Sequence, residues 1–174
     1  PLVGMKLYPA MLWLLTDTVN QYEEFRTHQS EEGVGIFDSM CPSYTIFNKK
    51  TERFSVIWTE FDSDYSVFLQ RYEDDCRRYG ACESMFPKDY KPDHAFDVSM
   101  LPWQSFSSFN LNVYGEGKWL LPIFTMGKTY VKEGRTLMPL AIQVHHAACD
   151  GYHVCKFAKT LQEKIVQLSE QDIG

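Results

Sequence analysis

The sequence has no hydrophobic run long enough to cross a membrane. Its longest stretch of apolar side chains is Ala10 to Leu15, whereas a membrane-spanning helix needs about twenty such residues. A secretory signal peptide is also lacking. These absences predict a protein that is not embedded in a membrane and that works in the cytoplasm.

The sequence also lacks a C-x-x-C motif and an even number of cysteines. Its five cysteines are irregularly spaced, at Cys41, Cys76, Cys82, Cys149 and Cys155. Disulfide frameworks and cysteine-based zinc sites need paired spacings, so this pattern predicts free thiols in a reducing compartment.

The sequence also has no excess of positive charge. The formal net charge is −6 over 174 residues, which argues against nucleic acid or an anionic membrane as the main partner. The negative net charge is still compatible with a small anionic cofactor that a few lysines hold. With 44% hydrophobic residues, no internal repeat and no low-complexity linker, residues 1–174 are expected to form a single globular domain.

Hydrophobic periodicity predicts three helices and a set of strands. The helices are expected over residues 8–26, 65–79 and 152–169, with Asp62-Ser63-Asp64 capping the second. Strands are expected at residues 34–37, 44–47, 54–58, 94–99, 108–114, 120–131 and 137–144. Because these strands come in hairpins rather than in strict alternation with helices, we predict an α+β or α/β two-layer sandwich. Its sheet is mixed and largely antiparallel, with the helices packed against it.

The richest stretch for chemistry is Val144 to His153, which reads V-H-H-A-A-C-D-G-Y-H. Three imidazoles and one carboxylate fall between an apolar strand and an amphipathic helix. Histidine can take and return a proton near neutral pH. His145 and His146 are adjacent, so on an extended strand they point to opposite faces and at most one can face a given cleft.

Three interpretations of this stretch compete. Asp150 is well placed to be the N-cap of the following helix, with the histidines playing a structural role. A metal site could use His146, Asp150 and His153, although the spacing matches no strong zinc or iron signature. The third interpretation is a general-base histidine with a structural aspartate. Cys149 is a possible nucleophile beside His146, but a small apolar filler is the more ordinary role for it.

The third interpretation is favoured because H-H-x-x-x-D-G is a motif of coenzyme A-dependent acyltransferases. Four further blocks resemble chloramphenicol acetyltransferases, in the same order and at matching separations. They are Phe47 with Phe54-Ser55, Met85-Phe86-Pro87, the run from Ser99 to Asn112, and the run from Pro122 to Lys128. The resemblance covers essentially the whole chain. It implies that about the first fifty residues of the family are not in this sequence.

The resemblance implies acetyl transfer from acetyl-CoA to a hydroxyl of chloramphenicol. His146 matches the family's general base, and Ser99 matches the serine that stabilises the oxyanion. Thr125 matches a threonine that holds a water near that oxyanion. Asp150 matches an aspartate that pairs with an arginine and shapes the site. No metal and no covalent enzyme intermediate are implied.

The resemblance also implies a substrate pocket, a cofactor site and an assembly. The pocket positions are Phe54, Met85, Phe86, Leu111, Val113, Trp119 and Ile123, and the acetyl-CoA positions are Lys128 and Phe109. Trp119 stands where the family has tyrosine, and Thr129 stands where it often has an aromatic residue. The family is a homotrimer with active sites between subunits. Two alternatives stay open: an acyltransferase of the same fold, such as the dihydrolipoyl acyltransferases, acting on another acceptor, and a relative that binds ligands without turnover.

Overall fold

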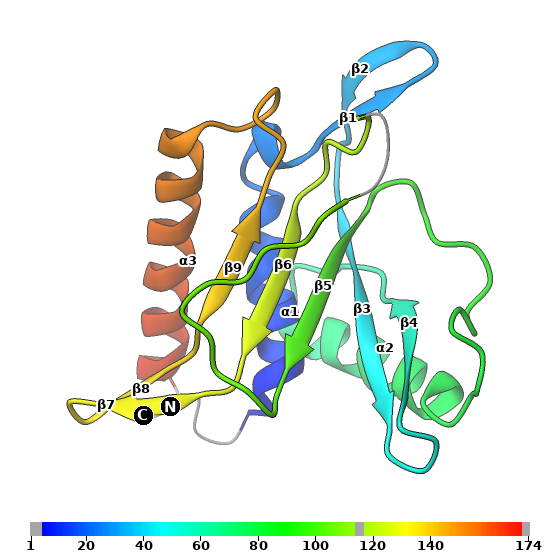
Figure 1. Ribbon diagram of the computed structural model, residues 1–174, viewed down its shortest axis with the longest axis vertical. Helices are drawn as coiled ribbons and strands as arrows, with labels where there is room; N and C mark the ends of the chain where they lie inside the picture. The colour runs from blue at the N-terminus through cyan, green and yellow to red at the C-terminus, as the bar shows by residue number, and fades with distance from the viewer. Residues whose placement is uncertain (1–4, 114–116, 172–174) are drawn as a thin grey trace.

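The fold is built on a five-stranded sheet with helices on one side (Figure 1). A computed structural model describes residues 5–113 and 117–171. The sheet order is β4 (Arg53–Trp58), β3 (Cys41–Asn48), β5 (Ala95–Leu101), β6 (Ile123–Gly127) and β9 (Leu140–Gln143). Two small hairpins project from it, formed by β1 (Thr27–Ser30) with β2 (Gly33–Ile36) and by β7 (Tyr130–Lys132) with β8 (Arg135–Leu137).

The sheet is mixed, as the sequence predicts. Its two outer pairs, β3–β4 and β6–β9, are antiparallel, and its two inner pairs, β3–β5 and β5–β6, are parallel. Since both hairpins are antiparallel too, antiparallel pairing predominates among the described strands.

Helices cover one face of the sheet (Figure 1). They are α1 (Leu7–Val19), α2 (Tyr65–Tyr79) and α3 (Gly151–Gln171). Helix α1 is the central one, with Leu12 and Leu15 fully buried. Its buried Thr16 and Thr18 hydroxyls donate to the carbonyls of Leu12 and Leu14, both at 2.7 Å, so neither of these two hydroxyls is left unpaired in the core.

Side-chain alternation divides the sheet residues between its two faces. Buried aromatic side chains such as Tyr44, Phe96 and Phe124 belong to the core formed with the helices. Their neighbours in sequence therefore point to the opposite face. The cross-strand registers place Ser43, Phe54, Asp97, Ser99, Ile123 and Thr125 together on that opposite face, which we call the open face.

A segment without regular structure crosses the open face over β6 and β9 (Figure 1). The Lys128 N–H donates to the Gln104 carbonyl at 2.9 Å, and the Leu111 N–H donates to Gln143 Oε1 at 3.2 Å. Gly127 permits the close approach, because a Cβ there would lie 2.7 Å from Pro139 and 2.8 Å from the Phe106 ring. Residues 104–111 thus run along the sheet between its two ends.

Two predicted elements differ from the structure: one helix ends early, and one strand does not form. The first helix stops at Val19, and a 3₁₀ turn, Glu23–Phe25, follows it. The Asn20 side chain ends the helix by bonding both backbone groups of Met40, accepting from its N–H at 2.7 Å and donating to its carbonyl at 3.2 Å. Residues 108–113 are not a strand, because Phe109 packs on Phe106 at 5.4 Å rather than joining the sheet; Tyr114 lies outside the described residues.

The two long strands predicted at residues 120–131 and 137–144 are each broken. The first is divided into β6 and β7. Of the second, only Leu140–Gln143 forms a strand in the sheet, β9, and its first residue, Leu137, is the last residue of β8. Pro139 interrupts the second because proline has no N–H to give to a ladder, although its carbonyl still accepts from Gly127 at 2.9 Å. Strand β1 had no signal in the sequence, since Thr27–Ser30 carries no apolar alternation.

Candidate active site

Ser99 and Thr125 stand side by side on the open face. They are paired residues on the parallel strands β5 and β6, and their hydroxyl oxygens are 3.3 Å apart. Thr125 is buried and Ser99 is half-buried. Two hydroxyls at adjacent register positions can present donors to one developing negative charge.

The two adjacent histidines differ in how the local turn uses them. His145 is tied into it: its Nδ1 accepts from the Ala147 N–H at 3.2 Å, and its carbonyl accepts from the N–H groups of Ala148 and Cys149 at 2.9 and 3.0 Å. His146 follows in the same turn with an exposed side chain. Of the two rings, that of His146 is the one left available for chemistry outside the chain's own turn.

Asp150 is the N-cap of α3, in a reciprocal arrangement with His153. Asp150 Oδ1 accepts from the N–H groups of Tyr152 and His153 at 2.9 and 3.2 Å, and His153 Nδ1 accepts from the Asp150 N–H at 3.2 Å. His153 Nε2 then faces Glu24 Oε1 at 3.3 Å, as suits a donor. The backbone N–H groups at the helix start, the one of His153 first, lower the pKa of the Asp150 carboxyl. The N-cap interpretation of Asp150 is therefore confirmed.

Cys149 is enclosed beside this cap. Its side chain is 3% exposed and its Sγ donates to the Glu24 carbonyl at 3.4 Å. Burial raises the pKa of the thiol to about 12, so it is overwhelmingly protonated at neutral pH. This environment fits the filler role and not a nucleophile. All five cysteines are free, as predicted.

The predicted pocket residues fall into two groups on the open face. Phe54 lies at the β3–β4 hairpin, where its ring centre is 5.1 Å from that of Phe47 and 6.0 Å from that of Trp103. Met85 and Phe86 lie along the outer edge of β4, where the Val56 N–H donates to the Met85 carbonyl at 2.7 Å. Among the predicted residues, exposure is high at Phe54, Met85, Phe86, Leu111, Val113 and Trp119. Such exposure of large apolar side chains is typical of a surface that binds something.

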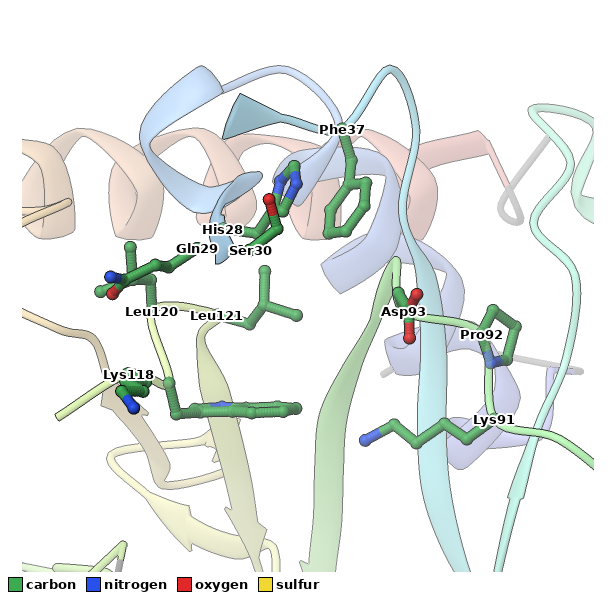
Figure 2. A pocket seen from close by; sticks show the side chains of 11 residues that line it. His28, Gln29, Ser30, Phe37, Lys91, Pro92, Asp93, Lys118, Leu120 and Leu121 are labelled. Carbon is green, nitrogen blue, oxygen red and sulfur yellow. The ribbon is translucent and has the colours of Figure 1, made fainter. Parts of the chain in front are cut away.

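Trp119 lies apart from Phe54 and Met85, in a cavity of about 350 Å³ between the β1 arm and the starts of β5 and β6 (Figure 2). The Lys91 ammonium sits 5.1 Å from the Trp119 ring and 2.5 Å from Asp97 Oδ1. The Lys91–Asp97 pair was not predicted, because Lys91 belongs to a loop whose sequence has no periodic signal. Ile123, in contrast, is the direct register partner of Asp97.

Lys128 and Phe109 occupy the other end of this surface. Lys128 follows β6 and is exposed, while the half-buried Phe109 belongs to the crossing segment. Thr129 and the exposed Tyr130 come next, at the start of β7. The positions expected to contact the cofactor and those expected to contact the substrate are thus spread along the sheet rather than gathered at one end.

One chain does not bring His146 and Ser99 together at a common point. Gln143, Ile123 and Asp97 form a row across β9, β6 and β5. Ser99 lies two residues to one side of this row and two strands from β9, roughly 10 Å laterally. His146 lies three residues past Gln143 on the other side.

Among the described residues there is no group of three His, Cys, Asp or Glu side chains able to hold a metal, so the metal alternative gains no support. Within the described part of the chain, no helix has the length and apolar character needed to span a bilayer.

The fold is shared by acetyltransferase catalytic cores. A solved chloramphenicol acetyltransferase superimposes with a TM-score of 0.82 at 21% identity, covering 92% of this chain and 78% of that one. The truncated catalytic core of the 2-oxoacid dehydrogenase multienzyme complex from Thermoplasma acidophilum superimposes with a TM-score of 0.65 at 15% identity, covering 96% and 73%. These superpositions place the chain in the fold class of acetyltransferase catalytic cores.

Sequence comparison narrows the class to one family. The family model for chloramphenicol acetyltransferase matches residues 2–162. A chloramphenicol acetyltransferase of Clostridium perfringens is 52% identical over 163 residues, which are 93% of this chain and 79% of the relative. The chain belongs to the chloramphenicol acetyltransferase family, and it is an acyltransferase.

Proposed function

We propose that this protein inactivates chloramphenicol in the cytoplasm by transferring the acetyl group of acetyl-CoA to a hydroxyl of the drug. The observation that carries the proposal is the 52% identity to a chloramphenicol acetyltransferase over nearly the whole chain. The chemistry needed is a base for a weakly acidic alcohol, a donor for an oxyanion and an apolar pocket for the acceptor.

His146 is the general base. Its ring nitrogen takes the proton as the acceptor oxygen attacks the thioester carbonyl carbon. The tetrahedral intermediate then breaks the C–S bond, and the proton passes from the imidazolium to the departing sulfur. An ester and free CoA leave. The exposed position of His146 in its turn supports this role, since the neighbouring His145 is engaged locally.

Ser99 stabilises the oxyanion, and Thr125 assists it. The Ser99 hydroxyl points from the open face and can donate to the oxygen that becomes negative during attack. Thr125, 3.3 Å away, can orient the Ser99 hydroxyl or hold a water beside it. Asp150 takes no proton in this scheme; it fixes the start of α3 and with it the end of the His146 turn.

The acceptor pocket is lined by apolar side chains of the open face, most of which are exposed. Their apolar character suits a nitrophenyl ring and a dichloroacetyl group. The residues are Phe54, Met85, Phe86, Leu111, Val113, Trp119 and Ile123. Acetyl-CoA lies toward the far end of β6. There Lys128 offers a charge to its phosphates and Phe109 offers an apolar contact.

The active enzyme is a homotrimer in which His146 of one copy faces the open face of the next. Two observations support this assembly: His146 and Ser99 are separated within one chain, and a wide set of apolar side chains is exposed. Packing a second copy on the open face would bury those side chains and exclude water from the reaction.

The first experiment measures the release of free CoA from acetyl-CoA with and without chloramphenicol. We expect release that depends on chloramphenicol and that falls by at least roughly 10²-fold in His146→Ala. The control His94→Ala alters a half-buried histidine outside the proposed site and should keep its activity. Release that occurs only with a different alcohol would overturn the acceptor, and undiminished release in His146→Ala would overturn the base.

A further inference from the structure

The segment bearing Met85 and Phe86 is attached along the edge strand β4. Ser55 Oγ donates to the Ser84 carbonyl at 2.8 Å, and the Val56 N–H donates to the Met85 carbonyl at 2.7 Å. The Lys88 ammonium then donates to the Trp58 carbonyl at 2.8 Å. Residues 84–88 thus run beside β4 in the same direction, and Lys88 holds their far end.

Lys88 is itself held by a buried carboxylate from α2. Its Nζ lies 2.7 Å from Asp75 Oδ1, and both side chains are only 16% exposed. The ammonium also sits 3.9 Å from the centre of the Trp58 ring, a cation–π contact. In this half-buried place the charge of Lys88 is paired and its aliphatic stem is packed.

The chain of hydrogen bonds continues into the core with a fixed direction. Thr59 Oγ1 donates to Asp75 Oδ2 at 2.8 Å, which uses its one hydrogen. The 2.7 Å contact between Tyr44 and Thr59 must then have the Tyr44 hydroxyl as donor. Tyr44 and Thr59 are fully buried, so Asp75 is oriented from both sides.

The segment needs such an anchor, because its own packing is weak. Met85 and Phe86 are 60% and 65% exposed, and Tyr90, just beyond them, has a positive φ of 50°. A non-glycine residue in that region persists only where its surroundings hold it. Lys88, which is paired with the largely buried Asp75, lies between the exposed pair and this strained residue.

We propose that Lys88, oriented by Asp75, is a positioning residue that fixes Met85 and Phe86 on the open face. Its consequence for acceptor binding rests on the proposed function. Lys88 does not touch the reacting atoms, so its loss should weaken acceptor binding without slowing acetyl transfer from the bound complex.

The test compares Lys88→Met with Lys164→Met in the full chain. Methionine keeps an unbranched stem and removes the charge. Lys164 offers a matched control because it pairs with Asp17 at 2.5 Å with 16% and 27% side-chain exposure, but between α3 and α1 on the helix side. We expect the KM for chloramphenicol to rise on the order of tenfold in Lys88→Met, with kcat and the KM for acetyl-CoA within about twofold of wild type. Lys88→Arg should restore part of the loss.

Hydrogen exchange at the Val56 amide gives a readout that needs no activity. This amide should exchange faster in Lys88→Met and be unchanged in Lys164→Met. If wild type fails to acetylate chloramphenicol while this difference is seen, the proposed function falls and the positioning role stands. An unchanged Val56 amide with an unchanged KM, or equal effects in both methionine variants, would overturn the positioning role.

Discussion

At the scale of single residues, the pairing of Ser99 with Thr125 is the most informative arrangement in the molecule. Two hydroxyls on predicted strands have no special meaning in a sequence, and serine is common. Their meaning comes from the register, which sets them 3.3 Å apart on the face without helices. A donor held there loses little freedom when charge develops, and that is why it can lower a barrier.

Removing the Ser99 hydroxyl should therefore affect the chemical step. In Ser99→Ala we expect kcat to fall on the order of 10²-fold, with the KM for chloramphenicol changed by less than about threefold. Steady-state kinetics on both substrates measures this. Ser66→Ala, at the exposed first turn of α2, is the control. A variant that loses affinity but keeps its kcat would assign Ser99 to substrate binding instead.

The roles of single residues were predictable from the sequence where a motif or a helix cap specified them. The H-H-x-x-x-D-G spacing located the His146 turn, and Asp150 before Gly151 indicated a helix start. Lys88 and Lys91 were not predictable as partners of Asp75 and Asp97, because each pair joins a loop to a distant element. Ion pairs of that kind depend on the tertiary fold and leave no local pattern.

At the scale of elements, the helices were predicted better than the strands. Helix α2 has the predicted bounds and its Asp64 cap, because a 3.6-residue pattern and a capping residue act locally. The strands near residues 120–144 were predicted too long. Whether an apolar run stays in a ladder depends on which neighbour approaches it, and here Pro139 and the crossing Phe106 segment end the ladders.

The start of α3 should give the protein a pH dependence at acid pH. The pKa of Asp150 is lowered from 3.8 in the folded protein, chiefly by the helix N–H groups, with His153 and His146 acting in the same direction and the nearby Glu24 facing His153. A lowered pKa adds stability above the unfolded pKa, and that stability is lost as the pH falls through the folded one.

Asp150→Asn isolates this contribution, because asparagine also caps helices but carries no charge. We expect wild type to exceed the variant in free energy of unfolding near neutral pH, and the difference to shrink as the pH drops below the ordinary carboxyl range. Urea unfolding at a series of pH values measures it. A difference that stays constant down to the acid limit would mean that the charge contributes nothing at this position.

At the scale of the whole molecule, the open face and the His146 turn argue for assembly. One chain exposes large apolar side chains over the very face that carries Ser99 and Thr125. We therefore expect sedimentation to give the mass of three chains of 20.3 kDa each. A chain that stays a monomer at all micromolar concentrations would contradict the trimer.

Mixing two inactive variants tests where the site lies. If His146 of one copy serves Ser99 of the next, co-refolded His146→Ala and Ser99→Ala chains should regain about a quarter of wild-type activity. One interface in four would then join two intact residues. Each variant refolded alone is the control. No recovery, in a mixture that forms trimers, would place both residues of a working site in the same chain.

One face of the sheet packs on the helices and the other carries Ser99 and Thr125. The enzyme is therefore sensitive to the number of residues in its strands. Ser99 points to the open face and Val98 points to the core only because side chains alternate along β5. Inserting or deleting one residue within β5, ahead of Ser99, would exchange the two, burying a hydroxyl and exposing an isopropyl group. Family members should therefore vary freely in residue identity within these strands, whereas changes in length accumulate in the loops between them.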